Sequence, residues 1–178
     1  MGIRPVLLLG NPLLRAACVR VRKYGTPDLL ELVADLTDTL HDFRLRHGFG
    51  RGIAAPQIGD NRRVLVIEAG GVSGGARAIV NPEIVRSSRQ MMTLWDDCFS
   101  FPDLAVKLKR HLSVEVRYRD PEGKEHLLKA RGALAELLQH EIDHVNGILA
   151  LDRAVDSKHI VYKTELEKIK KGALRKEM

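Results

Sequence analysis

Residues 132–147 read GALAELLQHEIDHVNG, and this stretch combines the pattern of a helix with side chains that can do chemistry. Apolar residues recur at helical spacing and form one stripe: Leu134, Leu138, Ile142 and Val145. Gly147 stands where a glycine commonly ends a helix. We therefore expect a helix from Gly132 to Asn146, at the centre of the fold.

The same helix carries an H-E-x-x-H motif from His140 to His144. Residues four apart share one helix face, with Cβ atoms roughly 5–6 Å apart, so two imidazoles can bind one metal ion. Glu141 lies about 100° around the helix from His140, where it can take a proton from a water beside the ion. The histidines face away from the apolar stripe, beside Ala133 and Leu137, which argues against a chance occurrence of the motif.

A catalytic site of this kind typically has three protein ligands, so a third one is needed. Residues 95–102 read WDDCFSFP and contain Cys98. A lone cysteine among aromatic and apolar residues is usually a small buried side chain, but beside the helix motif Cys98 becomes a candidate thiolate ligand. His159 is the downstream alternative, and it lies in a basic stretch that we expect to be a solvated helix.

A third segment, residues 50–59, reads GRGIAAPQIG. Its small residues let the backbone approach a ligand closely, and the amide of Gln57 is a donor suited to a developing oxyanion. Taken alone, the segment is more simply explained as a small-residue turn that leads into a strand.

In this order and spacing the three segments resemble the motifs of the peptide deformylase family, G-x-G-x-A-A-x-Q, E-G-C-L-S and Q-H-E-x-D-H. The resemblance also takes in Asn11-Pro12, the first predicted helix and residues 64–67 and 81–83, so it covers most of the chain. It implies an α+β fold and removal of the formyl group from the N-terminal methionine of new polypeptides.

The resemblance also implies the roles of individual residues. Three of them would hold one divalent metal ion: Cys98, His140 and His144. Glu141 would be the general acid/base, and Gln57 and the backbone N–H of Phe99 would stabilise the oxyanion. The implied metal is Fe²⁺, with Zn²⁺, Ni²⁺ or Co²⁺ as replacements, and a thiolate-bound ferrous ion favours a reducing compartment. The residues expected to border the substrate are Gly50, Arg51, Gly52, Leu94, Asp97, Glu136 and Leu137.

Four charged residues depart from the family's pattern. Asp96 replaces a glutamate, and we expect it to pair with an arginine such as Arg110; Asp97 replaces a glycine beside the substrate. Arg51 and Glu136 stand near the expected methionine pocket, Arg51 where the family has an apolar residue and Glu136 where an apolar or basic one is expected. We favour the interpretation that both side chains reach solvent. The alternative is an Arg51–Glu136 pair across the pocket rim that alters which acyl peptide fits.

The rest of the chain predicts one α+β domain over residues 1–178, with mixed or antiparallel sheets around the central helix and a C-terminal helix. A first helix should run from Thr26-Pro27 to about His47 and end at Gly48. A third helix should run from Val155 to about Lys171. Strands are expected over residues 63–68 and 77–85, the second with an interruption at Asn81-Pro82, and residues 105–119 alternate well enough for further strand pairing. A glycine-rich tip is expected at Ala69–Gly75 and a turn at Asp120–Gly123.

Composition and charge limit the partners. No apolar run approaches the ~20 residues of a membrane span, so we expect no membrane contact. The start lacks a signal peptide, so we expect a cytoplasmic protein. In that compartment a disulfide between Cys18 and Cys98 is not expected. The net charge is +6, and Arg153 to Met178 holds eight Lys/Arg against four Asp/Glu. This basic C-terminal helix could contact the ribosome, although solvation explains it more simply, and no motif points to DNA.

We expect an N-formylmethionyl peptide as the substrate, and three other functions remain open. A related amidase could act on a different N-acyl group. A non-catalytic, ribosome-associated metal-binding domain would have no use for Glu141. A zinc metalloprotease is disfavoured by a cysteine ligand that precedes the helix.

Overall fold

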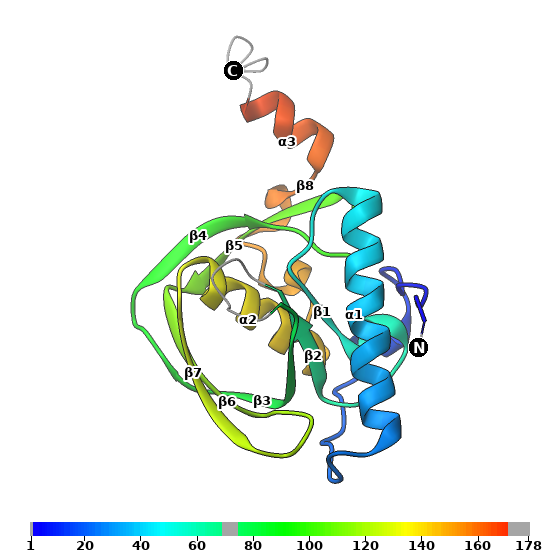
Figure 1. Ribbon diagram of the computed structural model, residues 1–178. Coiled ribbons are helices and arrows are strands. Elements are labelled where there is room, and N and C mark those ends of the chain that lie inside the picture. Colours follow the sequence, from blue (N-terminus) through cyan, green and yellow to red (C-terminus); the bar gives the residue numbers. More distant parts are fainter. Residues whose placement is uncertain (1, 69–74, 171–178) are drawn as a thin grey trace.

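Helix α2 (Ala133–Val145) lies between two antiparallel sheets, and helix α1 (Pro27–His47) covers the outer side of the larger one (Figure 1). The computed structural model describes residues 2–68 and 75–170. Most of the predicted tip Ala69–Gly75 therefore falls outside the described residues. The α+β prediction is confirmed, and the sheets are antiparallel rather than mixed.

The larger sheet has five strands in the order β1-β2-β3-β6-β7. Their bounds are Gly52–Ala54, Val64–Ile67, Arg77–Ser87, Ser113–Arg119 and Glu125–Arg131. The smaller sheet has the order β4-β5-β8, with bounds Met91–Asp96, Leu104–His111 and Ile160–Tyr162. The strand pairing predicted within residues 105–119 is confirmed, and the stretch forms two strands, β5 and β6, which belong to different sheets.

Strand β2 shows how the core is divided. Leu65 and Ile67 pack with the apolar stripe of α2, whereas Val64 and Val66 pack with α1. Successive side chains of a strand point to opposite faces, so β2 is buried on both faces and lies between the core around α2 and the core around α1. No helix among the described residues is long and apolar enough to cross a membrane.

The first two helices agree closely with their predicted bounds. Helix α1 ends at Gly48, whose φ of 75° is left-handed. Thr26 occupies the predicted N-cap position but makes no side-chain capping hydrogen bond. Helix α2 is followed by Gly147, also left-handed with φ of 74°. A Cβ on Gly147 would lie 2.6 Å from the carbonyl oxygen of Arg15, so this close approach requires a glycine.

The third predicted helix begins later than expected, so the prediction from Val155 is wrong. Residues 157–159 form a 3-10 helix, Ile160–Tyr162 form β8, and α3 spans only Lys163–Lys170. Strand β8 pairs with β5, and this tertiary pairing of an Ile-Val-Tyr run outweighs the local helical pattern. The side chain of Tyr162 is mostly exposed. Three further 3-10 helices span Pro12–Arg15, Ala55–Ile58 and Ala150–Arg153.

Candidate metal centre and its cavity

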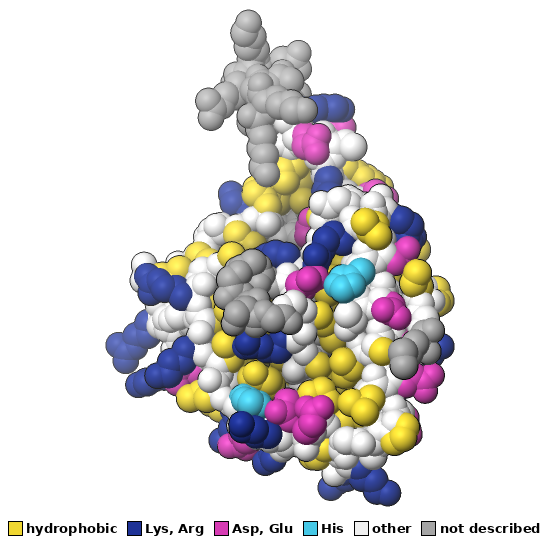
Figure 2. All heavy atoms as spheres, in the orientation of Figure 1, with side chains coloured by type: hydrophobic (Ala, Val, Ile, Leu, Met, Phe, Trp, Pro, Cys, Tyr) yellow, Lys and Arg dark blue, Asp and Glu magenta, His cyan; other side chains and the backbone are white. Residues whose placement is uncertain are grey.

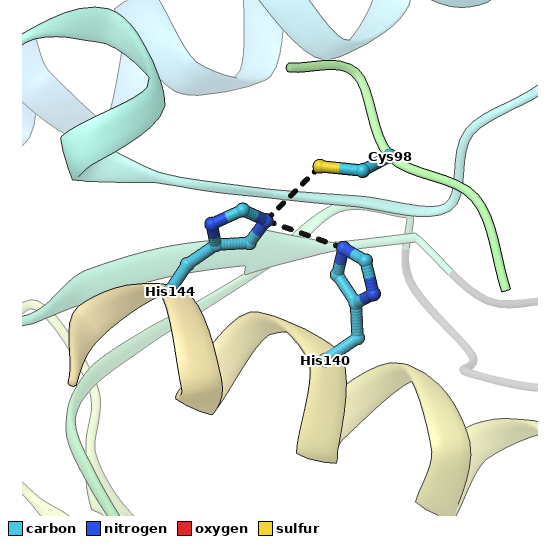
Figure 3. A group of neighbouring side chains, drawn as sticks. All are labelled: Cys98, His140 and His144. Atoms are coloured by element: carbon cyan, nitrogen blue, oxygen red, sulfur yellow. Dashed lines mark hydrogen bonds between the residues drawn. The ribbon is translucent and has the colours of Figure 1, made fainter. Parts of the chain in front are cut away.

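Three donor atoms meet where α2 passes beneath the loop that follows β4 (Figure 3). The Sγ of Cys98 lies 3.2 Å from Nε2 of His144, which lies 3.2 Å from Nε2 of His140. All three side chains are buried, and the donor atoms lie within 4.8 Å of one another. The two histidines come from one helix face, as the four-residue spacing predicts, and the cysteine comes from a segment more than forty residues away.

The spacing of these donors fits one small divalent ion. In a tetrahedral site, metal–nitrogen distances of about 2.0–2.1 Å place two nitrogens about 3.3 Å apart, and a metal–sulfur distance of about 2.3 Å places sulfur and nitrogen about 3.6 Å apart. The observed separations of 3.2 Å are close to both values. Burial lowers the pKa of His144 well below its ordinary value.

Asp96 fixes the orientation of His140. Its Oδ2 lies 3.0 Å from Nδ1 of His140, and because a carboxylate only accepts, Nδ1 carries the proton and Nε2 faces the other donors. Burial lowers the pKa of His140, but the Asp96 carboxylate outweighs it, and the pKa lies well above its ordinary value. The nearby charges of His140 and Arg110 outweigh burial at Asp96 in turn and lower the pKa of that carboxyl to about 2.

A buried arginine connects the carboxylates behind the site. Arg110 donates from Nη2 to Asp96 at 3.1 Å and from Nη1 to Asp143, and its side chain is only 3% exposed. The expected Asp96–Arg110 pair is thus confirmed. Asp143 also accepts from Arg153 at 2.6 and 2.8 Å. Helix α2 is therefore connected to β5 through Arg110, and to the 3-10 helix that follows α2 through Arg153.

Glu141 lies on α2, with its carboxylate against Gly52 of β1. Burial raises the pKa of its carboxyl to about 7, and its Oε2 has no hydrogen-bond partner among the described residues. A Cβ on Gly52 would lie 2.7 Å from Oε1 of Glu141, so the glycine leaves the space that this carboxylate occupies. The side chain can therefore exchange a proton near neutral pH with a molecule in the adjoining cavity.

Gln57 is held with its amide NH₂ towards Cys98. Its Oε1 accepts from the backbone N–H of Ala54 at 2.9 Å, which leaves Nε2 to donate to Sγ of Cys98 at 3.6 Å and to Oγ of Ser100 at 3.3 Å. The ring of Phe99 stacks on Phe43 with centroids 3.7 Å apart. This packing fixes the backbone of the segment that carries the cysteine.

A cavity of about 420 Å³ opens onto these groups. Six of the seven residues expected to border the substrate line it: Gly50, Arg51, Gly52, Asp97, Glu136 and Leu137. Leu94 does not line the cavity. It pairs with Leu108 across β4 and β5 and packs against the buried apolar cluster that contains Leu108. Arg44 and Phe49 also line the cavity, and the sequence had not singled them out although Phe49 stands directly before the Gly-Arg-Gly segment.

Arg51 and Glu136 form an ion pair on the cavity wall, with Nη2 and Oε2 2.5 Å apart. Arg51 also donates to the carbonyl oxygen of Ala133 at 3.1 Å. Our favoured interpretation, that both side chains reach solvent, is wrong for Glu136, whose side chain is 10% exposed against 43% for Arg51. Burial raises the pKa of Glu136, although Arg51 lowers it. Asp97 is about half exposed and pairs with Lys163.

Comparison with known proteins places this geometry in one family. Residues 3–159 match the family model described as polypeptide deformylase. Peptide deformylases of Rhizobium meliloti and Thermomicrobium roseum are each 37% identical, over 85% and 91% of this chain and 85% and 92% of theirs. The crystal structure of a peptide deformylase from Legionella pneumophila is similar with a TM-score of 0.81 and 35% identity, over 99% of both chains. That from Thermotoga maritima gives 0.79 and 29%, over 88% and 100%.

Proposed function

The chain belongs to the polypeptide deformylase family, and on that basis we propose which of its residues hold the metal, bind the peptide and transfer protons. It is a metal-dependent hydrolase that removes the N-formyl group from the N-terminal methionine of nascent polypeptides. The alternatives of a non-catalytic domain and a metalloprotease are not supported by these relatives.

We propose that Cys98, His140 and His144 hold one divalent ion, and that this ion is Fe²⁺. The donor spacing and the Asp96 contact to His140 support the ligand set. Thiolate and imidazole ligands suit Fe²⁺, Co²⁺, Ni²⁺ and Zn²⁺, so the other three ions should replace it. When bound, such an ion supplies positive charge that activates water and polarises a carbonyl oxygen.

The protein's own groups perform the remaining steps. Glu141 accepts a proton from the water that adds to the formyl carbon, and it then donates a proton to the nitrogen as the C–N bond breaks. A pKa of about 7 suits it to both transfers. The amide of Gln57 and the backbone N–H of Phe99 donate to the oxyanion that forms in between. Formate and a peptide with a free amino group are the products.

The cavity is the proposed site for the formylmethionyl end of the peptide. Gly50 and Gly52 provide a wall without side chains, and Leu137 provides apolar surface beside His140. The ion pair of Arg51 and Glu136 adds polar surface to the same cavity. In this proposal Leu94 does not border the peptide. It packs against the apolar cluster that contains Cys98 and so supports the segment that carries this ligand.

We further propose one domain over residues 1–178, a cytoplasmic location and contact with the ribosome through the basic C-terminal segment. Lys163 and Lys168 are the basic residues of α3 whose side chains the structure describes, and both are paired with acidic residues. On the face shown in Figure 2, basic, acidic and hydrophobic side chains are interspersed. Support for a ribosome contact therefore comes from charge at the chain end, not from a basic surface on this face.

The convergence of three buried donors with Glu141 carries the proposal, and formate release tests it. The protein should be purified without oxygen in the presence of Fe²⁺ and assayed with a formyl-Met tripeptide. Glu141→Gln should retain the metal and lose at least about 100-fold in kcat, because the carboxylate transfers both protons. If metal binds but the wild-type protein releases no formate, the substrate assignment is wrong and other N-acyl peptides become the candidates.

A further inference from the structure

Lys163, the first residue of α3, lies between two segments that border the cavity. Its Nζ is 2.9 Å from Oδ2 of Asp97 and 3.4 Å from the centre of the Phe49 ring. Its backbone N–H donates to the carbonyl oxygen of Asp103 at 2.8 Å. The side chain is 26% exposed, so most of this lysine is enclosed by its partners.

Both partners are next to residues of the proposed site. Asp97 directly precedes Cys98, and Phe49 directly precedes Gly50. The Phe49 ring also makes edge contacts with Phe43 and Phe99, with centroids 5.4 and 5.9 Å away. One ammonium group therefore joins the segment after α1 to the segment after β4, and these two segments supply different parts of the cavity border.

The position of Lys163 is set independently of the cavity. Strand β8 pairs with β5 from Ile160 to Tyr162, so the residue that follows is fixed at the edge of the smaller sheet. Figure 1 shows α3 extending away from the two sheets, so only its start lies near the segment after α1, where Lys163 meets Phe49. A partly enclosed ion pair and a cation–π contact are each modestly stabilising, and here one side chain makes both.

We propose that Lys163 is a positioning residue for the peptide substrate, which holds the cavity borders at Phe49 and Asp97 in register and so determines how tightly peptides longer than the formylated methionine bind. This inference rests on the proposed function, because it concerns the peptide that the cavity is proposed to take. Lys163 touches neither the reacting atoms nor the proposed metal ligands, so its loss should affect KM more than kcat.

The test compares Lys163→Met, which keeps an unbranched chain and loses the charge, with Lys163→Arg, which keeps the charge. Lys168→Met is the matched control, because Lys168 pairs with Glu165 on the same helix. For a formyl-Met tripeptide, Lys163→Met should raise KM about 3- to 10-fold with kcat nearly unchanged, and Lys163→Arg and Lys168→Met should stay near wild type. For formylmethioninamide, which does not extend past the first residue, the KM of Lys163→Met should change little.

Hydrogen exchange of the holoenzyme provides a second readout that does not depend on activity. In Lys163→Met, amides of residues 48–52 and of residues 97–100 should exchange several-fold faster than in wild type. An unchanged KM for the tripeptide, or an equal rise for both substrates, would overturn the proposal. If the wild-type protein releases no formate, the proposed function is wrong. Faster exchange in both segments would then still support the role of Lys163 in holding the two cavity borders together, and unchanged exchange would overturn that role.

Discussion

Arg110 shows what a single buried charge does for the site. It lies between Asp96 and Asp143 and is almost fully enclosed. Replacing it with methionine removes the cation that the two buried carboxylates share and leaves Asp96 with only His140 and Asp143 with only Arg153. Breaking a buried ion pair in this way typically costs about 3–5 kcal/mol of unfolding free energy. Urea denaturation should show this loss for Arg110→Met and no measurable change for Arg117→Met, whose pair with Glu83 is exposed. Equal effects of the two substitutions would contradict the role given to Arg110.

Gly52 is the residue whose size decides where Glu141 lies. A methyl group there would overlap the carboxylate, so Gly52→Ala should displace Glu141 and lower kcat for formate release by roughly 10- to 100-fold. Gly2→Ala is the control, because no atom lies within 4 Å of a Cβ at that position. A Gly52→Ala variant with wild-type kcat would show that Glu141 has room to move.

The Arg51–Glu136 pair makes a prediction about substrate preference. Arg51→Ile alone would leave Glu136 buried without its cation, so the informative variant is Arg51→Ile with Glu136→Leu. This double substitution gives the cavity an apolar wall and should raise kcat/KM for a formyl-Met peptide about 3- to 10-fold. An unchanged kcat/KM would mean that the pair does not contact the methionine side chain.

At the level of helices, the glycines after α1 and α2 provide a matched comparison. Both have left-handed backbones, but a Cβ on Gly48 would meet no atom within 4 Å, whereas one on Gly147 would meet the Arg15 backbone. Gly48→Ala should therefore cost only the conformational strain of about 1 kcal/mol. Gly147→Ala should cost at least ~2 kcal/mol, measured as the unfolding free energy. Equal costs would show that the Arg15 segment moves freely.

These elements also show how far local pattern predicts structure. Helices α1 and α2 were predictable because each carries a regular apolar stripe and ends at a glycine. Strand β8 was mistaken for helix, and the break between β5 and β6 was missed, because both depend on pairing with distant strands. The ion pairs of Arg51 and Lys163 join residues 85 and 66 positions apart, and sequence separation alone does not tell which charges meet.

At the scale of the whole molecule, the fold brings together three motif segments that are far apart in the sequence. Helix α2 supplies two donors from between the sheets, the loop after β4 of the smaller sheet supplies Cys98, and the segment after β1 of the larger sheet supplies Gln57. The order of the motifs suggested this convergence only through resemblance to a family. Its geometry depends on how the two sheets pack around α2.

The ligand set of the metal is the central claim, and X-ray absorption of the iron-loaded protein measures it most directly. We predict one sulfur at about 2.3 Å and nitrogen or oxygen donors at about 2.0–2.2 Å from the ion, as a Cys98, His140 and His144 site requires. In Cys98→Ser the sulfur contribution should disappear, whereas in Cys18→Ser, the control for the other free cysteine, it should remain. A wild-type spectrum without sulfur, or one that Cys98→Ser leaves unchanged, would contradict the proposed centre.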